Sequence, residues 1–210
     1  MMNETGHRDT GRLALAIGVV AAGSAVCLAT YFALALQEPF GTINDIGNGA
    51  TGVLSAALAW RLRGLVPGRA GKVAVGAALV GGAITVAGSA LVVSETTGFF
   101  LAGLVSSVGF AAIGTWLVVL NRSEAVADAW PPRLRTLGTA AGALMALGFV
   151  SAPGIVLGLD DMATAPAWTW VGSLGWLGIF VVYPAWAIWL ASVETRRAGR
   201  SVQLPGGTQA

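Results

Sequence analysis

Polar side chains interrupt an otherwise apolar stretch early in the chain, and they are the best candidates for chemistry in this sequence. They follow helical spacing and consist of Asn44, Asp45, Asn48, Thr51 and Ser55. At about 100° per residue, these five positions share one face of a helix. A carboxylate beside amide and hydroxyl groups can bind a small cation, a polar molecule or a lipid headgroup, so we interpret this face as a candidate ligand site.

Three further acidic residues, Glu38, Asp160 and Asp161, are predicted to lie at the same outer end of the protein as Asp45. Together with the polar face they would line an outward-opening pocket. A simpler interpretation remains open, in which Asp45 or the asparagine before it caps the start of a helix. The remaining amide and hydroxyl groups would then make interhelical hydrogen bonds worth about 0.6 kcal/mol each.

Asp160 and Asp161 also allow an enzymatic hypothesis. Adjacent aspartates can hold a divalent metal and a diphosphate, as a membrane-embedded lipid- or prenyl-processing enzyme would require. The position that would complete the familiar aspartate spacing is Thr164, however, which favours an ordinary polar turn.

Residue types that are scarce in this sequence exclude several kinds of site. The only histidine, His7, lies in the N-terminal leader, which excludes a bis-histidine haem, a HExxH zinc site and a Ser-His hydrolase within the membrane. The only lysine, Lys72, lies in a predicted loop, so an intramembrane Schiff base is excluded as well. The only cysteine, Cys27, excludes an internal disulfide and a cysteine-based zinc site. We therefore predict no metal site and no cofactor.

The composition is that of a membrane protein. Hydrophobic residues make up 55% of the 210 residues and charged residues only 10%, whereas soluble domains carry roughly 25% charged residues. The formal net charge of +2 does not by itself indicate a nucleic-acid partner, and we predict none. The predicted partner is the lipid bilayer.

Apolar runs long enough to cross a bilayer predict an all-α, polytopic integral membrane protein with six transmembrane helices, arranged as three antiparallel hairpins. The first run is too long for a signal peptide and is predicted to be retained. A leader at 1–12 precedes it, and a charged tail at 193–210 is predicted to be disordered. The predicted spans are about 13–36, 41–60, 73–93, 98–120, 137–159 and 168–192.

The distribution of charge predicts the orientation. All twelve lysines and arginines lie in the termini or in the loops after the second and fourth spans. The other three loops hold acidic residues and no base. Because basic loops stay inside, both termini are predicted to be cytoplasmic in a multi-pass cell membrane protein of the bacterial inner-membrane type.

Small residues, prolines and tryptophans predict how the helices pack. Glycines such as Gly138 and Gly142 recur every four residues, which lets neighbouring backbones approach closely. Pro153 and Pro184 fall inside predicted helices and should kink them. Most of the eight tryptophans are interpreted as anchors at the two membrane interfaces.

These observations leave three functional hypotheses open. We favour a small membrane protein that binds or translocates a small polar or cationic molecule, or a lipid, through the polar face of the second helix. The first alternative is a non-catalytic membrane subunit, whose small-residue faces would contact a second copy or another membrane protein. The second is the lipid- or prenyl-processing enzyme described above. The sequence resembles no particular family.

Overall fold

The computed structural model describes residues 4–34 and 39–202, and all regular secondary structure in these residues is helical, as the sequence predicts. The α-helices are α1 (Glu4–Ala33), α2 (Phe40–Arg61), α3 (Gly68–Val93), α4 (Phe99–Arg122), α5 (Glu124–Ala127), α6 (Pro132–Ala146), α7 (Ala152–Val156), α8 (Thr169–Leu177) and α9 (Tyr183–Val202). Two 3₁₀ segments, η1 (Arg63–Leu65) and η2 (Leu147–Ser151), and one π-helical turn, η3 (Gly178–Val182), complete the set.

Five helical stretches within the described residues are long and apolar enough to cross a membrane, which indicates a multi-pass membrane protein. They are Glu4–Ala33, Gly68–Val93, Phe99–Arg122, Pro132–Val156 and Thr169–Gly199. Helix α2 has 22 residues, which is also enough at 1.5 Å per residue. It is not among the five because its polar residues lower its mean hydropathy.

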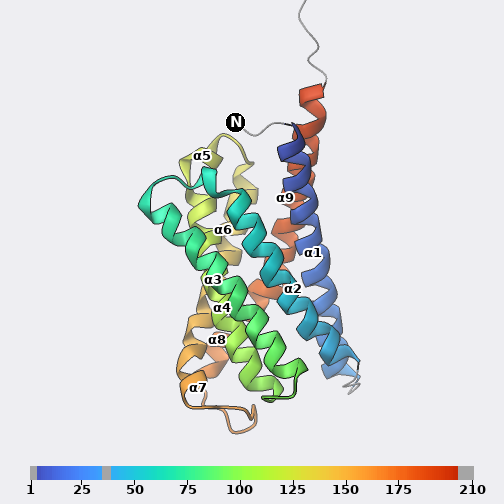
Figure 1. The fold of residues 1–210 in the computed structure, drawn as a ribbon, viewed down its shortest axis with the longest axis vertical. Coiled ribbons are helices and arrows are strands. Elements are labelled where there is room, and N and C mark those ends of the chain that lie inside the picture. The colour runs from blue at the N-terminus through green and yellow to red at the C-terminus, as the bar shows by residue number, and fades with distance from the viewer. Residues whose placement is uncertain (1–3, 35–38, 203–210) are drawn as a thin grey trace, which may run out of the picture.

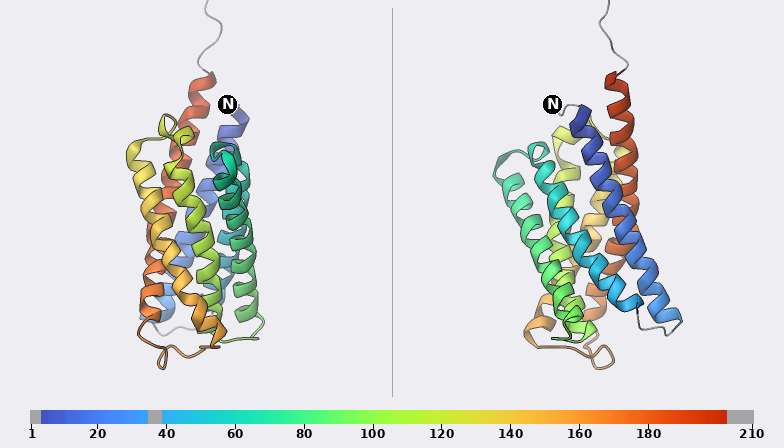
Figure 2. Two further views of the ribbon diagram at one scale, coloured as in Figure 1. Left: turned by 90° about the vertical axis from the view of Figure 1, so that its left-hand side faces the viewer. Right: turned by 45° about the vertical axis from the view of Figure 1, so that its right-hand side comes forward.

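The long helices run roughly along one axis, and consecutive helices run in opposite directions, so the two ends of the described chain lie at the same end of the molecule (Figures 1 and 2). Extensive contacts join α3 to α4, α2 to α3, α4 to α6, and α1 to both α2 and α9. The contact between α1 and α9 brings the two ends of the sequence together. It closes the helices into a single bundle rather than a row of separate pairs.

Close backbone packing at glycine confirms the predicted role of the small residues in α6. A β-carbon added to Gly142 would lie 2.5 Å from the carbonyl oxygen of Gly114 on α4. The reverse addition, on Gly114, would place a β-carbon 2.7 Å from the carbonyl oxygen of Gly142. Neither contact is tolerable for real β-carbons, so only glycine at both positions allows α4 and α6 to approach this closely.

Both intrahelical prolines lie beside a change of helix type, as the predicted kinks require. The 3₁₀ segment η2 ends just before Pro153, and the π-helical turn η3 ends just before Pro184. A proline lacks the N–H that would bond to the carbonyl four residues earlier, and its ring crowds that carbonyl. The backbone before each proline therefore leaves regular α-helical geometry.

The structure corrects the interfacial interpretation for three of the eight tryptophans. Trp116 and Trp186 are fully buried in the core, and Trp130 is 3% exposed. Trp60 and Trp170, in contrast, are more than half exposed, as interfacial residues are. Bulk rather than amphipathicity explains the buried tryptophans, because a core made largely of glycine and alanine needs a few large side chains to fill it.

The structure also corrects the predicted disordered tail for residues 193–202, which continue α9, while residues 203–210 lie outside the described part of the chain. The continuation of the helix is held by Glu194, whose side chain is 1% exposed. Its carboxylate lies 2.6 Å from Nδ1 of His7 and accepts a 2.9 Å hydrogen bond from Nε1 of Trp130. The leader is ordered by the same contacts, since α1 already begins at Glu4.

Candidate functional site

Helix α2 turns its polar face into the bundle, as the sequence predicts. Asn44 is 1% exposed and Asp45 is 9% exposed, although both are strongly polar. The opposite face of α2 is apolar and open, with Ile43 and Ile46 about half exposed. Burying the amide and the carboxylate away from the outer surface of the bundle avoids the cost of placing them against lipid.

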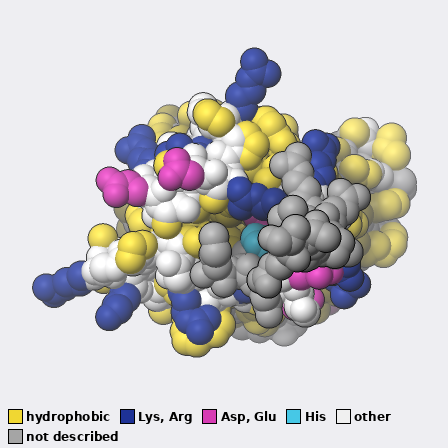
Figure 3. Space-filling view, turned by 90° about the horizontal axis from the view of Figure 1, so that it is seen from above, with side chains coloured by type: hydrophobic (Ala, Val, Ile, Leu, Met, Phe, Trp, Pro, Cys, Tyr) yellow, Lys and Arg dark blue, Asp and Glu magenta, His cyan; other side chains and the backbone are white. Residues whose placement is uncertain are grey.

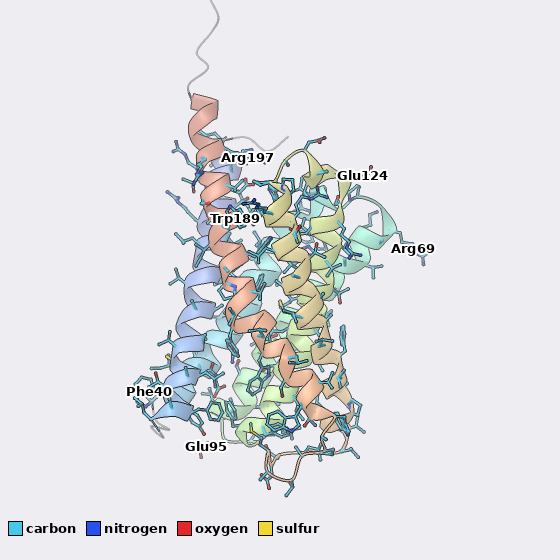
Figure 4. The ribbon with its side chains drawn as sticks, turned by 180° about the vertical axis from the view of Figure 1, so that it is seen from behind. Phe40, Arg69, Glu95, Glu124, Trp189 and Arg197 are labelled. Atoms are coloured by element: carbon cyan, nitrogen blue, oxygen red, sulfur yellow. The ribbon has the colours of Figure 1, made fainter. Side chains whose placement is uncertain are left out.

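Asn44, Asp45 and Asn48 line one partly open cavity, so the structure brings these three predicted site residues together. The cavity lies in the half of the bundle where α2 begins, opposite the two chain ends; Phe40 marks this end of α2 in Figure 4. The remaining walls come from α1, α3, α4, α8 and η3, and are formed by Leu28, Gly88, Val92, Phe99, Ala102, Gly103, Ser106, Ser107, Phe110, Trp176, Ile179 and Phe180.

Oxygen atoms dominate the polar part of the cavity wall. The Nδ2 amide of Asn44 donates a 3.3 Å hydrogen bond to Oδ1 of Asp45. The Oδ1 atom of Asn44 is buried and has no hydrogen-bond partner among the described residues. An unmatched buried carbonyl of this kind costs about 1–3 kcal/mol, so it calls for a donor or a cation beyond those that the described residues supply.

The wall facing α2 carries two serines from α4. Ser107 donates a 2.8 Å hydrogen bond from Oγ to the carbonyl of Gly103 and accepts one of 3.3 Å from Nε1 of Trp176. Ser106 is 9% exposed and lies against Gly88 of α3, where any β-carbon would collide with its hydroxyl group. The absence of a side chain at position 88 therefore leaves room for Ser106 in the wall.

Aromatic rings surround the oxygen-lined part of the cavity. Phe99 begins α4, Trp176 lies near the end of α8, and Phe180 lies in the π-helical turn. The rings of Trp176 and Phe180 meet edge to face, with their centroids 6.5 Å apart. π-Helical turns are frequent at functional sites because they rotate a side chain out of α-helical register. Here the turn contributes Ile179 and Phe180 to the cavity wall.

The space inside is small. About 30 Å³ is open to the centres of water-sized molecules, which corresponds to about two water molecules. In this conformation the cavity fits a small ion or a very small polar molecule.

Thr51 and Ser55 lie on the same face of α2, but they do not line the cavity. Thr51 Oγ1 donates to the carbonyl of Gly47. The Ser55 hydroxyl donates to the carbonyl of Thr51 at 2.6 Å and lies 2.8 Å from the hydroxyl of Tyr183 on α9. Because the single Ser55 proton is used on Thr51, Tyr183 donates to Ser55. The two hydroxyl groups therefore join α2 to α9 on the side of the cavity that faces the chain ends.

Asp160 and Asp161 do not line the cavity either. The carboxylate of Asp160 accepts backbone hydrogen bonds from Gly98 (2.6 Å) and Leu101 (3.0 Å), so it caps the first turn of α4 from another loop. Asp161 accepts from the backbone N–H of Ala163 and, at 3.2 Å, from the hydroxyl of Thr164. Both carboxylates thus satisfy local donors.

No group of three or more histidine, cysteine, aspartate or glutamate side chains that could hold a metal occurs in residues 4–34 and 39–202. The structure therefore adds nothing to the aspartate-rich enzyme hypothesis. Glu38, the remaining candidate, lies outside the described residues.

Sequence reasoning does not identify the serine and aromatic walls of the cavity. Ser107 lies four residues after Gly103 and before Ala111, a small-residue spacing that predicts only helix packing. Trp176 is one of the eight tryptophans, most of which are interpreted as interfacial anchors. The one sequence feature that could indicate these wall residues is the presence of hydroxyl and indole groups within apolar helices. Which of them face Asn44 depends on helix rotation, and a single sequence does not give this.

Comparison with protein-family models, with curated proteins and with solved structures finds no match to this chain. A function must therefore be inferred from the geometry of the chain itself.

Proposed function

We propose that this protein is a six-span inner-membrane protein that binds or translocates a small cation or a small polar molecule through the cavity beside α2. The observation that carries the proposal is that Asn44, whose buried Oδ1 has no partner among the described residues, lines the cavity beside Asp45. An intramembrane carboxylate is costly and is kept where it serves a ligand or a partner.

The arrangement of the helices supports α2 as the sixth span. Five helical stretches are long and apolar enough to cross the membrane, yet both ends of the described chain lie at the same end of the bundle (Figure 1). A chain that starts and finishes on one side crosses an even number of times. With α2 as the remaining crossing, α1 pairs with α2, α3 with α4, and α6 with α8 and α9, in antiparallel hairpins.

Charge supports a cytoplasmic location for the end that holds the termini. Figure 3 views this end and shows basic side chains spread around its rim. Arg8, Arg61, Lys72 and Arg135 belong to the segments that meet here, while Glu95 and Asp160 belong to turns at the opposite end. By the positive-inside rule the basic end faces the cytoplasm and the cavity lies in the outer half of the membrane.

The chemistry of the walls supports the class of ligand. A carboxylate, an amide carbonyl and serine hydroxyls are hard oxygen groups that suit a small cation or a hydrogen-bond donor. The rings of Phe99, Trp176 and Phe180 add faces that attract positive charge. An anion would meet the Asp45 carboxylate and is disfavoured.

A thermal-unfolding titration of the full chain in mild detergent tests this proposal. The probes are Na⁺, K⁺, ammonium and guanidinium chloride, exchanged at constant ionic strength against the bulky N-methylglucamine ion, which is too large for the cavity. At a hundredfold excess over Kd, a bound probe stabilises the protein by about 2.7 kcal/mol. We expect one or more probes to raise the Tm of the wild type and not of Asp45→Asn.

The matched control is Asp160→Asn, which removes a carboxylate at the same end but outside the cavity. This variant should have a lower Tm than the wild type, and the probe should still raise that Tm. Equal probe-induced shifts in wild type and Asp45→Asn would overturn cation binding at this cavity. Native mass spectrometry of wild type beside Asn44→Leu extends the test to neutral ligands, since a co-purified small molecule should be lost from the variant.

A further inference from the structure

A second recess lies at the opposite end of the molecule from the cavity. It is a groove of about 370 Å³ between the end of α2 and the start of α3, formed by Trp60, Arg63, Val66, Pro67, Gly68, Gly71, Lys72, Val75, Gly76 and Leu79. The loop between the two helices projects from the bundle, and Arg69, at the start of α3, lies next to it in Figure 4. Part of the groove wall is apolar helix surface, and its mouth is basic.

Arg63 is held in place at the mouth of this groove. Its Nη1 donates a 2.7 Å hydrogen bond to the carbonyl of Trp60, and its guanidinium carbon lies 4.4 Å from the centre of the Trp60 ring. An arginine stacked on an indole is pre-oriented, and it still has N–H groups to offer to an anion. Trp60 itself is 55% exposed, which is typical of a residue at the headgroup level.

No acidic residue lines the groove among the described residues, and neither Arg63 nor Lys72 forms an ion pair with a described carboxylate. The recess near α9 differs in this respect. It contains Arg196 and Arg197, but also Asp128, and Arg197 lies 3.8 Å from the carboxylate of Glu194. The positive charge in the groove between α2 and α3 therefore has no described carboxylate beside it, which is also true of the recess that contains Arg122 and Arg135.

Two glycines shape the groove in different ways. A β-carbon on Gly71 would collide with the carbonyl of Val66, so this glycine lets the loop fold down onto α3. A β-carbon on Gly76 would meet nothing within 4 Å. Position 76 thus leaves an open channel along α3 towards Leu79, on the side where Val80 is 59% exposed. An acyl chain fits such a surface.

We propose that this groove binds one anionic phospholipid of the cytoplasmic leaflet, with its phosphate between Arg63 and Lys72 and an acyl chain along α3 over Gly76. A basic mouth at headgroup level above an apolar wall is complementary to a single anionic lipid. The assignment to the cytoplasmic leaflet rests on the orientation proposed above. The binding itself does not depend on it.

Lipid titration followed by native mass spectrometry of the full chain tests the site. Phosphatidylglycerol is the anionic probe, and phosphatidylcholine with the same acyl chains is the zwitterionic reference. Each basic residue near a membrane surface contributes about fivefold to the affinity for anionic lipid. We expect the double variant Arg63→Gln/Lys72→Gln to bind phosphatidylglycerol about 25-fold more weakly and to lose the preference over phosphatidylcholine.

Two controls keep the test specific. Arg122→Gln/Arg133→Gln removes the same charge from the end of α4 and the start of α6 and should leave the preference intact. An equal loss in that variant would show general charge attraction and would overturn the site. Unchanged phosphatidylglycerol binding in Arg63→Gln/Lys72→Gln would overturn it as well.

A steric variant tests the groove without changing charge. An added β-carbon meets nothing within 4 Å at Gly76 or at Gly23. Gly76→Leu should obstruct the channel and weaken the binding of both lipids, while Gly23→Leu, on α1, should not. Equal lipid binding in wild type and Gly76→Leu would rule out the acyl channel. Labelling of Gly64→Cys with a membrane-impermeant maleimide in intact cells reports the orientation separately. If the cysteine is modified, the loop faces outward and the lipid belongs to the outer leaflet, while the lipid preference stays as proposed.

Discussion

Nδ1 of His7 lies 2.6 Å from Oε2 of Glu194, so the first and last described helices are joined across 187 positions of the sequence. Glu194 is 1% exposed and also accepts the indole N–H of Trp130 at 2.9 Å. The contact therefore links α1, α9 and the segment between α5 and α6. These are the elements that close the bundle at the end holding both termini.

Removing the Glu194 carboxylate should destabilise this end of the bundle. In Glu194→Ala, the buried Trp130 N–H loses its acceptor, which costs about 1–3 kcal/mol. We expect a lower Tm and earlier proteolysis at the two terminal helices. Glu194→Gln keeps an acceptor for Trp130, so its Tm should lie between those of the wild type and Glu194→Ala. The exposed Glu124 provides the control, since Glu124→Ala should behave like wild type; equal stability of Glu194→Ala would refute the role of this contact.

Replacing Asp160 should loosen the start of α4. Asp160 caps the N–H groups of Gly98 and Leu101 from a loop about 60 residues later, and loss of a cap costs about 0.5–2 kcal/mol. Asp160→Ala should therefore speed hydrogen exchange at these two amides first. The variant Glu95→Gln, in the turn before α4, changes charge without touching the cap and should leave the exchange rates unaltered. Unchanged exchange in Asp160→Ala would contradict the capping role.

Breaking the hydrogen bond between Ser55 and Tyr183 should weaken the join between α2 and α9. A double-mutant cycle with Ser55→Ala and Tyr183→Phe should give a coupling energy of about 0.6–1.7 kcal/mol. Both hydroxyls are buried and lie 2.8 Å apart. Reversible unfolding in detergent measures the cycle. Additive effects of the two substitutions would mean that the hydroxyls do not stabilise each other.

Adding one methyl group at Gly142 should separate α4 from α6. Its β-carbon would lie 2.5 Å from a backbone oxygen of Gly114, which cannot rotate away as a side chain can. We expect Gly142→Ala to cost about 1–3 kcal/mol through overpacking. Gly23→Ala, where the new β-carbon meets nothing within 4 Å, should be neutral or slightly stabilising because alanine favours helix. A neutral Gly142→Ala would show that the two helices can separate at little cost.

The helical periodicity of apolar and polar residues, together with composition, is enough to predict the helices and the inward direction of the polar face of α2. Apolar length and Lys/Arg position are local properties that the sequence carries directly. Helical spacing likewise places Asn44 and Asn48 on one side of α2. The same reasoning predicts the approach of α6 at Gly142 and the irregular backbone near Pro153 and Pro184.

Tertiary structure decided which polar groups meet. Asp160 and Asp161 lie in the predicted turn, but Asp160 caps α4 and Asp161 bonds within its own turn, so neither lines the cavity. Ser106 and Trp176 do line it, although their helices are distant from α2 in the sequence. Sequence reasoning places Glu194 in a disordered tail, because its burial depends on His7 and Trp130, neither of which is near it in sequence. Hydropathy and spacing report the environment of a residue along its own helix. Helix rotation and the partner across the interface come from packing of the whole bundle, which only the folded chain determines.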